Sequence, residues 1–196
     1  MKKCTIEQSG RSMIEMLGVL AIVGVLSVAG IAGYSKAMAK YKTNKVVDQI
    51  SSLVANIRTT FAAHGNYKGL SKSSAYKLGI YPEDMVKSCN TDGYNPQCMK
   101  NAFGGEVYIK QMEESESSQY ASGFVINFAG LSKEACSSIL TIDWGSNSGF
   151  WGYGTNETSQ LKYKTDLMPA ALLTIGQIAD ICKCKENTCS IILGFS

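Results

Sequence analysis

The sequence predicts an α+β fold, in which a long N-terminal α-helix is apolar in its first half and packs by its second half on an antiparallel β-sheet head. A long apolar run near the N-terminus continues into a helical pattern, and two segments near the middle of the chain alternate like strands. Six of the seven cysteines lie at position 89 or beyond. Apolar residues make up 45% of the 196-residue chain, which is enough for one modest domain besides the apolar run.

The apolar run covers residues 16–32 and is long enough to span a bilayer, which takes about 20 apolar residues. A short polar leader, residues 1–10, precedes it. Glu15 is the only charged residue from position 13 to position 32. A carboxylate at the edge of an apolar span either reaches the lipid headgroups or has a cationic partner, and one interpretation places that partner on another copy of the chain.

The charges alone leave the orientation of this span open. Lys2, Lys3 and Arg11 precede the span and favour a cytoplasmic N-terminus, but four lysines follow it at positions 36, 40, 42 and 45, and the positive-inside rule counts them the other way. Because paired cysteines belong to oxidising compartments, we expect the C-terminal part outside the cytoplasm. The alternative is an ordinary signal peptide cut near Ala37-Met38-Ala39.

Beyond the apolar run the helical pattern becomes amphipathic. Apolar residues recur at spacings of three and four at Val46, Val47, Ile50, Leu53, Val54, Ile57 and Phe61. His64-Gly65-Asn66 supplies C-cap chemistry, so a helix from Ser12 to Ala63 would be roughly 78 Å long. We expect a leader at 1–10, a transmembrane and assembly segment at 11–34, an amphipathic half at 35–64 and a globular disulfide-bonded head at 65–196.

The head is expected to contain short helices and strands. Residues 106–112 alternate like a strand, and residues 123–128 read as a second, more buried strand, which together suggest an antiparallel hairpin or meander. A short helix, a second helix and a terminal strand are expected at 131–140, 168–182 and 188–195.

The segment 9–17, Ser-Gly-Arg-Ser-Met-Ile-Glu-Met-Leu, resembles the class III leader junction of type IV pilins and related pseudopilins. In that family a prepilin peptidase cuts after a glycine, and a glutamate stands at the fifth mature position before an apolar helix. Here Gly10 matches the glycine, Arg11 becomes the first mature residue and Glu15 falls at the fifth position. Arg11 departs from the apolar first residue that is usual in the family, whose terminal amine is commonly methylated.

The resemblance implies a structural subunit of a type IV pilus or a related filament, held in the inner membrane before assembly and extracellular afterwards. Expected partners are further copies of the chain, prepilin peptidase and the inner-membrane assembly machinery; neither an enzymatic activity nor a cofactor is expected. The α-ammonium group of Arg11 would pair with Glu15 of a neighbouring subunit, so that the carboxylate is satisfied only in the polymer. Small residues at Gly18, Ala21 and Gly24 would let helices approach closely.

The six cysteines from Cys89 onward can pair in many ways. A cysteine on a short helix, a second late cysteine and a closing strand are similar to the disulfide-bounded C-terminal region of type IV pilins, especially the class b group. The resemblance therefore implies three disulfides, Cys136–Cys182, Cys89–Cys98 and Cys184–Cys189. Zinc is the alternative for the last three cysteines, but their spacing differs from the usual knuckle and the chain has one histidine.

An aromatic, glycine-rich segment at 146–156 has two interpretations. Either Phe150, Trp151 and Tyr153 form an exposed surface that recognises a sugar, a host or another filament, or they pack on the sheet or against the next subunit. The first interpretation also fits a different protein, a secreted or membrane-tethered cysteine-rich binding module. No P-loop, Gly-x-Ser-x-Gly or Gly-x-Gly-x-x-Gly motif is present, and a net charge of +3 without a basic stripe gives no indication of nucleic-acid binding.

Overall fold

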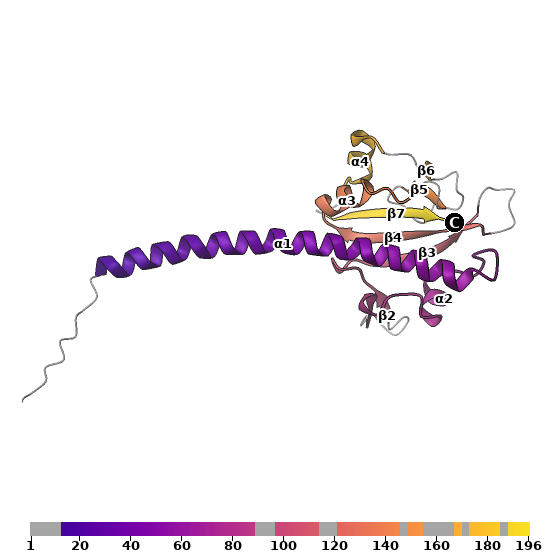
Figure 1. Ribbon diagram of the computed structural model, residues 1–196, viewed down its shortest axis with the longest axis horizontal. Coiled ribbons are helices and arrows are strands. Elements are labelled where there is room, and N and C mark those ends of the chain that lie inside the picture. Colours follow the sequence, from indigo (N-terminus) through magenta and orange to yellow (C-terminus); the bar gives the residue numbers. More distant parts are fainter. Residues whose placement is uncertain are drawn as a thin grey trace, which may run out of the picture. The chain divides into compact units, whose positions relative to one another are not determined.

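The computed structural model describes residues 13–88, 97–113, 121–145, 149–154, 167–169, 173–184 and 188–196. The chain divides into two compact units, Met1–Lys40 and Tyr41–Ser196. One helix, α1, contributes residues to both units (Figure 1). We call its residues 13–40 the apolar half and its residues 41–61 the amphipathic half.

Helix α1 covers Met13–Phe61, which agrees with the helix predicted by the apolar run and the amphipathic pattern. It ends where the backbone N–H of His64 donates to the carbonyl of Phe61 at 2.9 Å. Gly65 follows with φ of 65°, in the left-handed region that favours glycine after a helix. The C-cap chemistry of this segment therefore terminates the helix close to the predicted position.

The head, formed by the second unit, contains a five-stranded antiparallel sheet with the order β3-β4-β7-β5-β6. Its strands are β3 (Val107–Met112), β4 (Gly123–Leu131), β5 (Phe150–Gly154), β6 (Met168–Pro169) and β7 (Cys189–Phe195). The predicted hairpin is present, because β3 pairs with β4 from Val107 opposite Phe128 to Met112 opposite Gly123. The predicted terminal strand is also present, and it lies in the middle of the sheet, between β4 and β5.

The core of the head forms between the amphipathic half of α1 and one face of this sheet, and Figure 1 shows the helix running along the strands. Helix residues at spacings of three and four are buried, and Ile50, Leu53 and Ile57 are fully buried. They join Phe124 and Phe128 of β4 in one hydrophobic cluster. The predicted helical periodicity thus corresponds to a real packing face.

Between α1 and β3 the chain forms α2 (Lys72–Lys77), a short 3-10 turn (Glu83–Met85) and a two-stranded sheet of β1 (Val86–Ser88) and β2 (Gln97–Met99). Ser71 starts α2 through a capping box with Ser74. The backbone N–H of Gln111 donates to the carbonyl of Leu70 at 3.2 Å and attaches this region to the edge strand β3.

The C-terminal region contains α3 (Lys133–Leu140) and α4 (Ile175–Ile181). Helix α3 lies within the predicted range 131–140, and Ser132 is its N-cap. The prediction of one helix over 168–182 is wrong, because Met168 and Pro169 pair with β5 as strand β6. A capping box between Thr174 and Gln177 then starts α4.

Candidate functional site

The apolar half of α1 is exposed except at Met38, which is half-buried. An 18-residue window of this helix has a mean hydropathy of 2.3 and none of it is buried, so α1 is long and apolar enough to cross a membrane. From Met13 to Tyr34 its large apolar side chains are between 52% exposed, at Met16, and 85% exposed, at Met13. A contiguous apolar surface of this kind is not stable in water and indicates a contact with lipid or with other protein.

Glu15 lies in the first turn of α1, and its side chain is exposed. A carboxylate in the first turn interacts favourably with the partial positive charge at the helix N-terminus. Gly10 and Arg11, the predicted cleavage and pairing residues, lie outside the described residues. The processing site and the pairing of Glu15 with a neighbouring amino terminus therefore remain predictions.

Two serine hydroxyls of the apolar half form hydrogen bonds within the helix. The hydroxyl of Ser27 donates to the carbonyl of Val23 at 2.7 Å, and the hydroxyl of Ser35 donates to the carbonyl of Ile31 at 3.0 Å. Such bonds satisfy a hydroxyl without water and allow it to enter an apolar environment. A Cβ added at Gly18 would meet nothing within 4 Å, so the bare backbone there is accessible to a second helix.

Four of the cysteines form two disulfides in the C-terminal region. Cys136 of α3 bonds to Cys182 at the end of α4, and Cys184 bonds to Cys189 at the start of β7. Both are pairings that the resemblance implied, whereas the third, between Cys89 and Cys98, involves a residue outside the described part of the chain. The cysteines considered for zinc are thus used in disulfides, and within the described ranges no group of three or more potential ligands could hold a metal ion.

The aromatic side chains of the segment 146–156, for which recognition and packing were both considered, are buried. Phe150, Trp151 and Tyr153 are 4%, 9% and 3% exposed. Their strand β5 pairs with the central strand β7, and both faces of β5 are covered by other residues. The Phe150 ring packs on Phe195 at 5.2 Å between ring centroids. The Trp151 ring covers Gly123, where an added Cβ would lie 2.4 Å from it. These rings belong to the core of the head, which corrects the prediction of recognition and agrees with the alternative that they pack on the sheet.

A polar cluster attaches the amphipathic half of α1 to the region that follows it. Lys45 Nζ lies 2.8 Å from Asp84 Oδ2, and the side-chain amide of Gln49 donates to the same oxygen at 3.0 Å. The amide oxygen of Gln49 accepts from the backbone N–H of Ala102 at 3.1 Å. Gln49 was not identified from the sequence, and it is 3% exposed; the signal was its position three residues after Val46 and four before Leu53, on the apolar stripe.

The contacts within this polar cluster shift the pKa values of Asp84 and Lys45. Burial alone would raise the pKa of the Asp84 carboxyl, but hydrogen bonds from Lys45 and Gln49 outweigh burial and hold the pKa below its ordinary value. The hydrogen bond to Asp84 and the charge of that residue raise the pKa of Lys45. Both groups are therefore ionised near neutral pH, and the pair is a structural contact.

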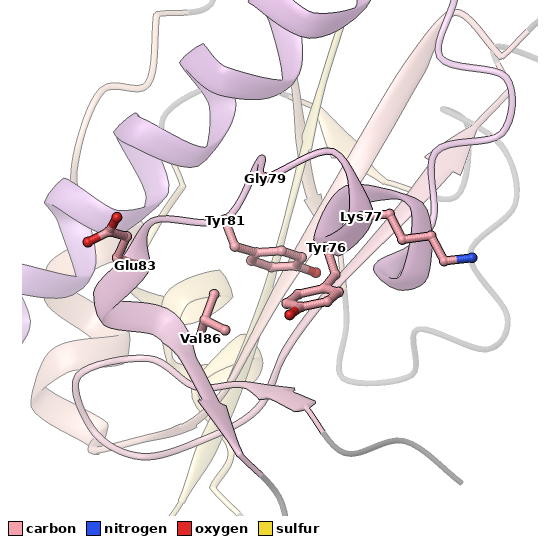
Figure 2. Close-up of a pocket in the computed structure, with 6 residues that line it drawn as sticks. All are labelled: Tyr76, Lys77, Gly79, Tyr81, Glu83 and Val86. Atoms are coloured by element: carbon pink, nitrogen blue, oxygen red, sulfur yellow. The ribbon is translucent and has the colours of Figure 1, made fainter.

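A hollow of about 620 Å³ lies beside α2 and is lined by Tyr76, Lys77, Gly79, Tyr81, Glu83 and Val86 (Figure 2). Figure 2 shows the two tyrosine rings close together, with Lys77 and Glu83 pointing away from each other. Burial raises the pKa of the Tyr81 phenol, which finds no hydrogen-bond partner among the described residues. This lining brings no nucleophile and base together, so it offers no acid–base chemistry.

Comparisons with known proteins agree with this architecture. A family model described as Bundlin matches residues 35–181. The major structural subunit of bundle-forming pilus from Escherichia coli O111:H- is 22% identical over 187 residues, which cover 92% of this chain and 91% of that protein. The protein of the same name from Escherichia coli O127:H6 (strain E2348/69 / EPEC) is 24% identical over 187 residues, with the same coverage.

The crystal structure of TcpA, a type IV pilin from Vibrio cholerae El Tor biotype, is similar in fold. It matches with a TM-score of 0.51 and 16% identity, over 80% of this chain and 99% of that chain. The predicted fold class, a long N-terminal helix on an antiparallel sheet, is confirmed by this match and by the strand topology.

Proposed function

Because this chain belongs to the Bundlin family, we propose that it is a structural subunit of a type IV pilus. The observation that carries the proposal is the helix α1, whose amphipathic half buries one face in its own head while residues 13–37 of its apolar half are all exposed. A filament of such subunits covers the apolar halves with one another and leaves the heads outside. The curated relatives are named as major structural subunits of bundle-forming pilus, which supports the same role here. The role is structural, and the protein acts on no substrate.

Before assembly the subunit is held in the inner membrane by the apolar half of α1. Its hydropathy supports this stage, since the alternative for an uncovered apolar helix is aggregation in water. The head faces the oxidising side, where its disulfides form. The assembly machinery of the inner membrane then transfers the subunit to an extracellular filament.

Processing precedes assembly in this proposal. Prepilin peptidase cuts after Gly10, and Arg11 becomes the first residue of the mature chain. Its α-ammonium group then pairs with Glu15 of a neighbouring subunit. A carboxylate in an apolar helix bundle is costly unless a cation compensates it, so this pair fixes the register between subunits as well as attracting them.

The proposal is tested with Glu15→Ala, which removes the carboxylate. We expect this variant to be cleaved and folded but to form at least tenfold fewer filaments, counted by electron microscopy of surface pili and by immunoblotting of sheared pili. Glu134→Ala, which removes an exposed carboxylate from the head, is the matched control and should assemble normally.

Intact-mass measurement of the mature protein provides an independent check. A chain that begins at Arg11 supports the proposal. A chain that begins close after Ala39 would identify a cleaved signal peptide and a secreted head, and it would contradict assembly through the helix. Normal filaments from Glu15→Ala would contradict the role of the carboxylate.

A further inference from the structure

Four lysines follow the apolar run of α1, and two of them remain without a partner in the described part of the chain. No acidic residue occurs between Glu15 and Asp48. In the head, Lys45 pairs with Asp84, and Lys42 lies over the ring of Phe103 at 5.8 Å from its centroid. In contrast, the side chains of Lys36 and Lys40 are exposed.

The placement of these two lysines opposes the usual rule for membrane insertion. Lysines and arginines concentrate on the cytoplasmic side of a membrane span, but Lys36 and Lys40 follow the span on the side that carries the disulfide-bonded head. They are also four residues apart on one helix, where two like charges are neighbours and repel each other. An anion that lies between them would remove both costs.

We propose that Lys36 and Lys40 bind the phosphate groups of anionic phospholipids in the outer leaflet of the inner membrane while the subunit awaits assembly. The inference rests on the membrane-anchored stage of the proposed function. It adds a lipid class as the partner and two residues as its site. Tyr34, which is 68% exposed, would lie beside them at the depth where aromatic residues anchor membrane helices.

Helix geometry supports this depth. The segment from residue 13 to residue 33 is about 31 Å long at 1.5 Å per residue, which matches a hydrocarbon core of about 30 Å. With this segment in the core, Lys36 lies about 4.5 Å and Lys40 about 10 Å beyond the boundary, within or just outside a headgroup layer of about 5–8 Å. The flexible stems of both lysines then carry their ammonium groups to the level of the phosphates.

The alternative partner is a carboxylate of a second copy of the chain in the filament. Some exposed acidic residues of the head are already engaged, since Asp180 is paired with Lys183 and Asp84 with Lys45, whereas others such as Glu134 are exposed. A lipid phosphate is available as soon as the span is inserted, whereas a carboxylate on another head becomes available only after assembly.

The test uses the purified full chain in a nonionic detergent and native mass spectrometry with added phosphatidylglycerol or phosphatidylcholine. The double variant Lys36→Gln with Lys40→Gln keeps the helix-forming tendency of both positions but removes their charge. Each lysine near an anionic surface contributes about fivefold to binding, so we expect the double variant to bind phosphatidylglycerol about thirtyfold more weakly. Binding of phosphatidylcholine should not change.

The matched control is Lys68→Gln with Lys133→Gln, which removes two exposed lysines of the head and should leave phosphatidylglycerol binding unchanged. All variants keep the basic residues of the N-terminus, so a difference in lipid binding between them is due to Lys36 and Lys40. Equal binding of phosphatidylglycerol by the native chain and the double variant would overturn the inference. So would a double variant that assembles poorly but binds this lipid normally, since that result would assign the lysines to a second copy of the chain.

A separate measurement distinguishes this inference from the proposed function. The native chain is mixed with vesicles of pure phosphatidylcholine, and incorporation is followed by flotation. If the chain does not incorporate, the membrane-anchored stage fails and the lipid site fails with it. If the chain incorporates but shows no dependence on Lys36 and Lys40, only the lipid site is overturned.

Discussion

The two halves of α1 have the same secondary structure but acquire their stability from different partners. In the amphipathic half, Ile50 and Leu53 are fully buried against the sheet of the same chain, and polar residues cover the opposite side. In the apolar half, Leu20 and Leu26 are 66% and 65% exposed, and no polar side exists. A helix that is apolar all round needs lipid or other helices around it, so this half is completed only by what surrounds the subunit.

The largest expected effect comes from removing the disulfide between Cys136 and Cys182. This change destabilises the head, so it tests whether the apolar half of α1 stays helical when the head unfolds. Closing a loop of 46 residues stabilises a fold by about 4 kcal/mol in the chain-entropy model, so Cys136→Ala with Cys182→Ala should lower the free energy of unfolding of the head by that amount. Cys184→Ala with Cys189→Ala opens a much shorter loop and should cost about 2 kcal/mol.

The measurement is urea unfolding of the full chain in detergent, followed by tryptophan fluorescence and by circular dichroism. Both tryptophans, Trp144 and Trp151, lie in the head and report its unfolding. The apolar half should keep its helical signal after the head has unfolded. Simultaneous loss of both signals would contradict the independence of the two halves.

A matched pair of leucine substitutions tests the comparison directly. Leu53→Ala removes a fully buried side chain and should destabilise the head by about 3 kcal/mol, because it leaves a cavity in the core. Leu20→Ala removes an exposed side chain from the other half, so unfolding of the head should change by less than about 0.5 kcal/mol. Urea unfolding measured by tryptophan fluorescence checks both values, and a similar loss in the two variants would show that the halves unfold together.

Tyr81→Phe tests how well the head satisfies its own polar groups. The phenol of Tyr81 is buried without a partner among the described residues, so its removal should raise the free energy of unfolding by about 1 kcal/mol. Because burial raises the pKa of this phenol, the native head loses stability as pH rises above the ordinary tyrosine pKa, and the variant should lose less. Tyr76→Phe, in the same hollow, is the control. If Tyr81→Phe is instead less stable than the native chain, the hydroxyl of Tyr81 forms a hydrogen bond in the folded head.

The smallest expected effect concerns the contact of Lys45 with Asp84. The pKa of Asp84 is lowered in the folded state, so the stability from this contact is complete above the ordinary aspartate pKa and is lost as pH falls below it. Both side chains are more than a third exposed, and solvent screening keeps the effect small. Unfolding at a series of pH values should show a slightly weaker acid dependence in Lys45→Gln, and an unchanged profile would assign the acid dependence to other carboxyls.

Sequence periodicity was sufficient for the elements whose neighbours are local. It predicted α1, the β3–β4 hairpin and α3, because helical spacing, strand alternation and a serine N-cap are properties of consecutive residues. For the last helix it predicted the range 168–182, but α4 begins only at Ile175, and that residue is 87% exposed. A short apolar run does not reveal which of its members will face the core.

The features that the sequence did not predict depend on long-range pairing. The aromatic segment at Phe150 was interpreted as a loop with two possible roles, because its strand character depends on β7 being its neighbour. Likewise, the burial of Gln49 depends on Asp84 and on the backbone of Ala102, which are distant in the chain. These contacts follow from the order of the strands, which local spacing does not contain.

That order has a consequence for biogenesis. The strand that joins β4 to β5 is β7, which follows both of them in the chain and is synthesised after both of them. Until β7 is present, β5 has only the two-residue strand β6 beside it, and the five-stranded sheet is incomplete. The hairpin of β3 and β4 can pair before β7 is made, whereas β5 joins the sheet only through β7.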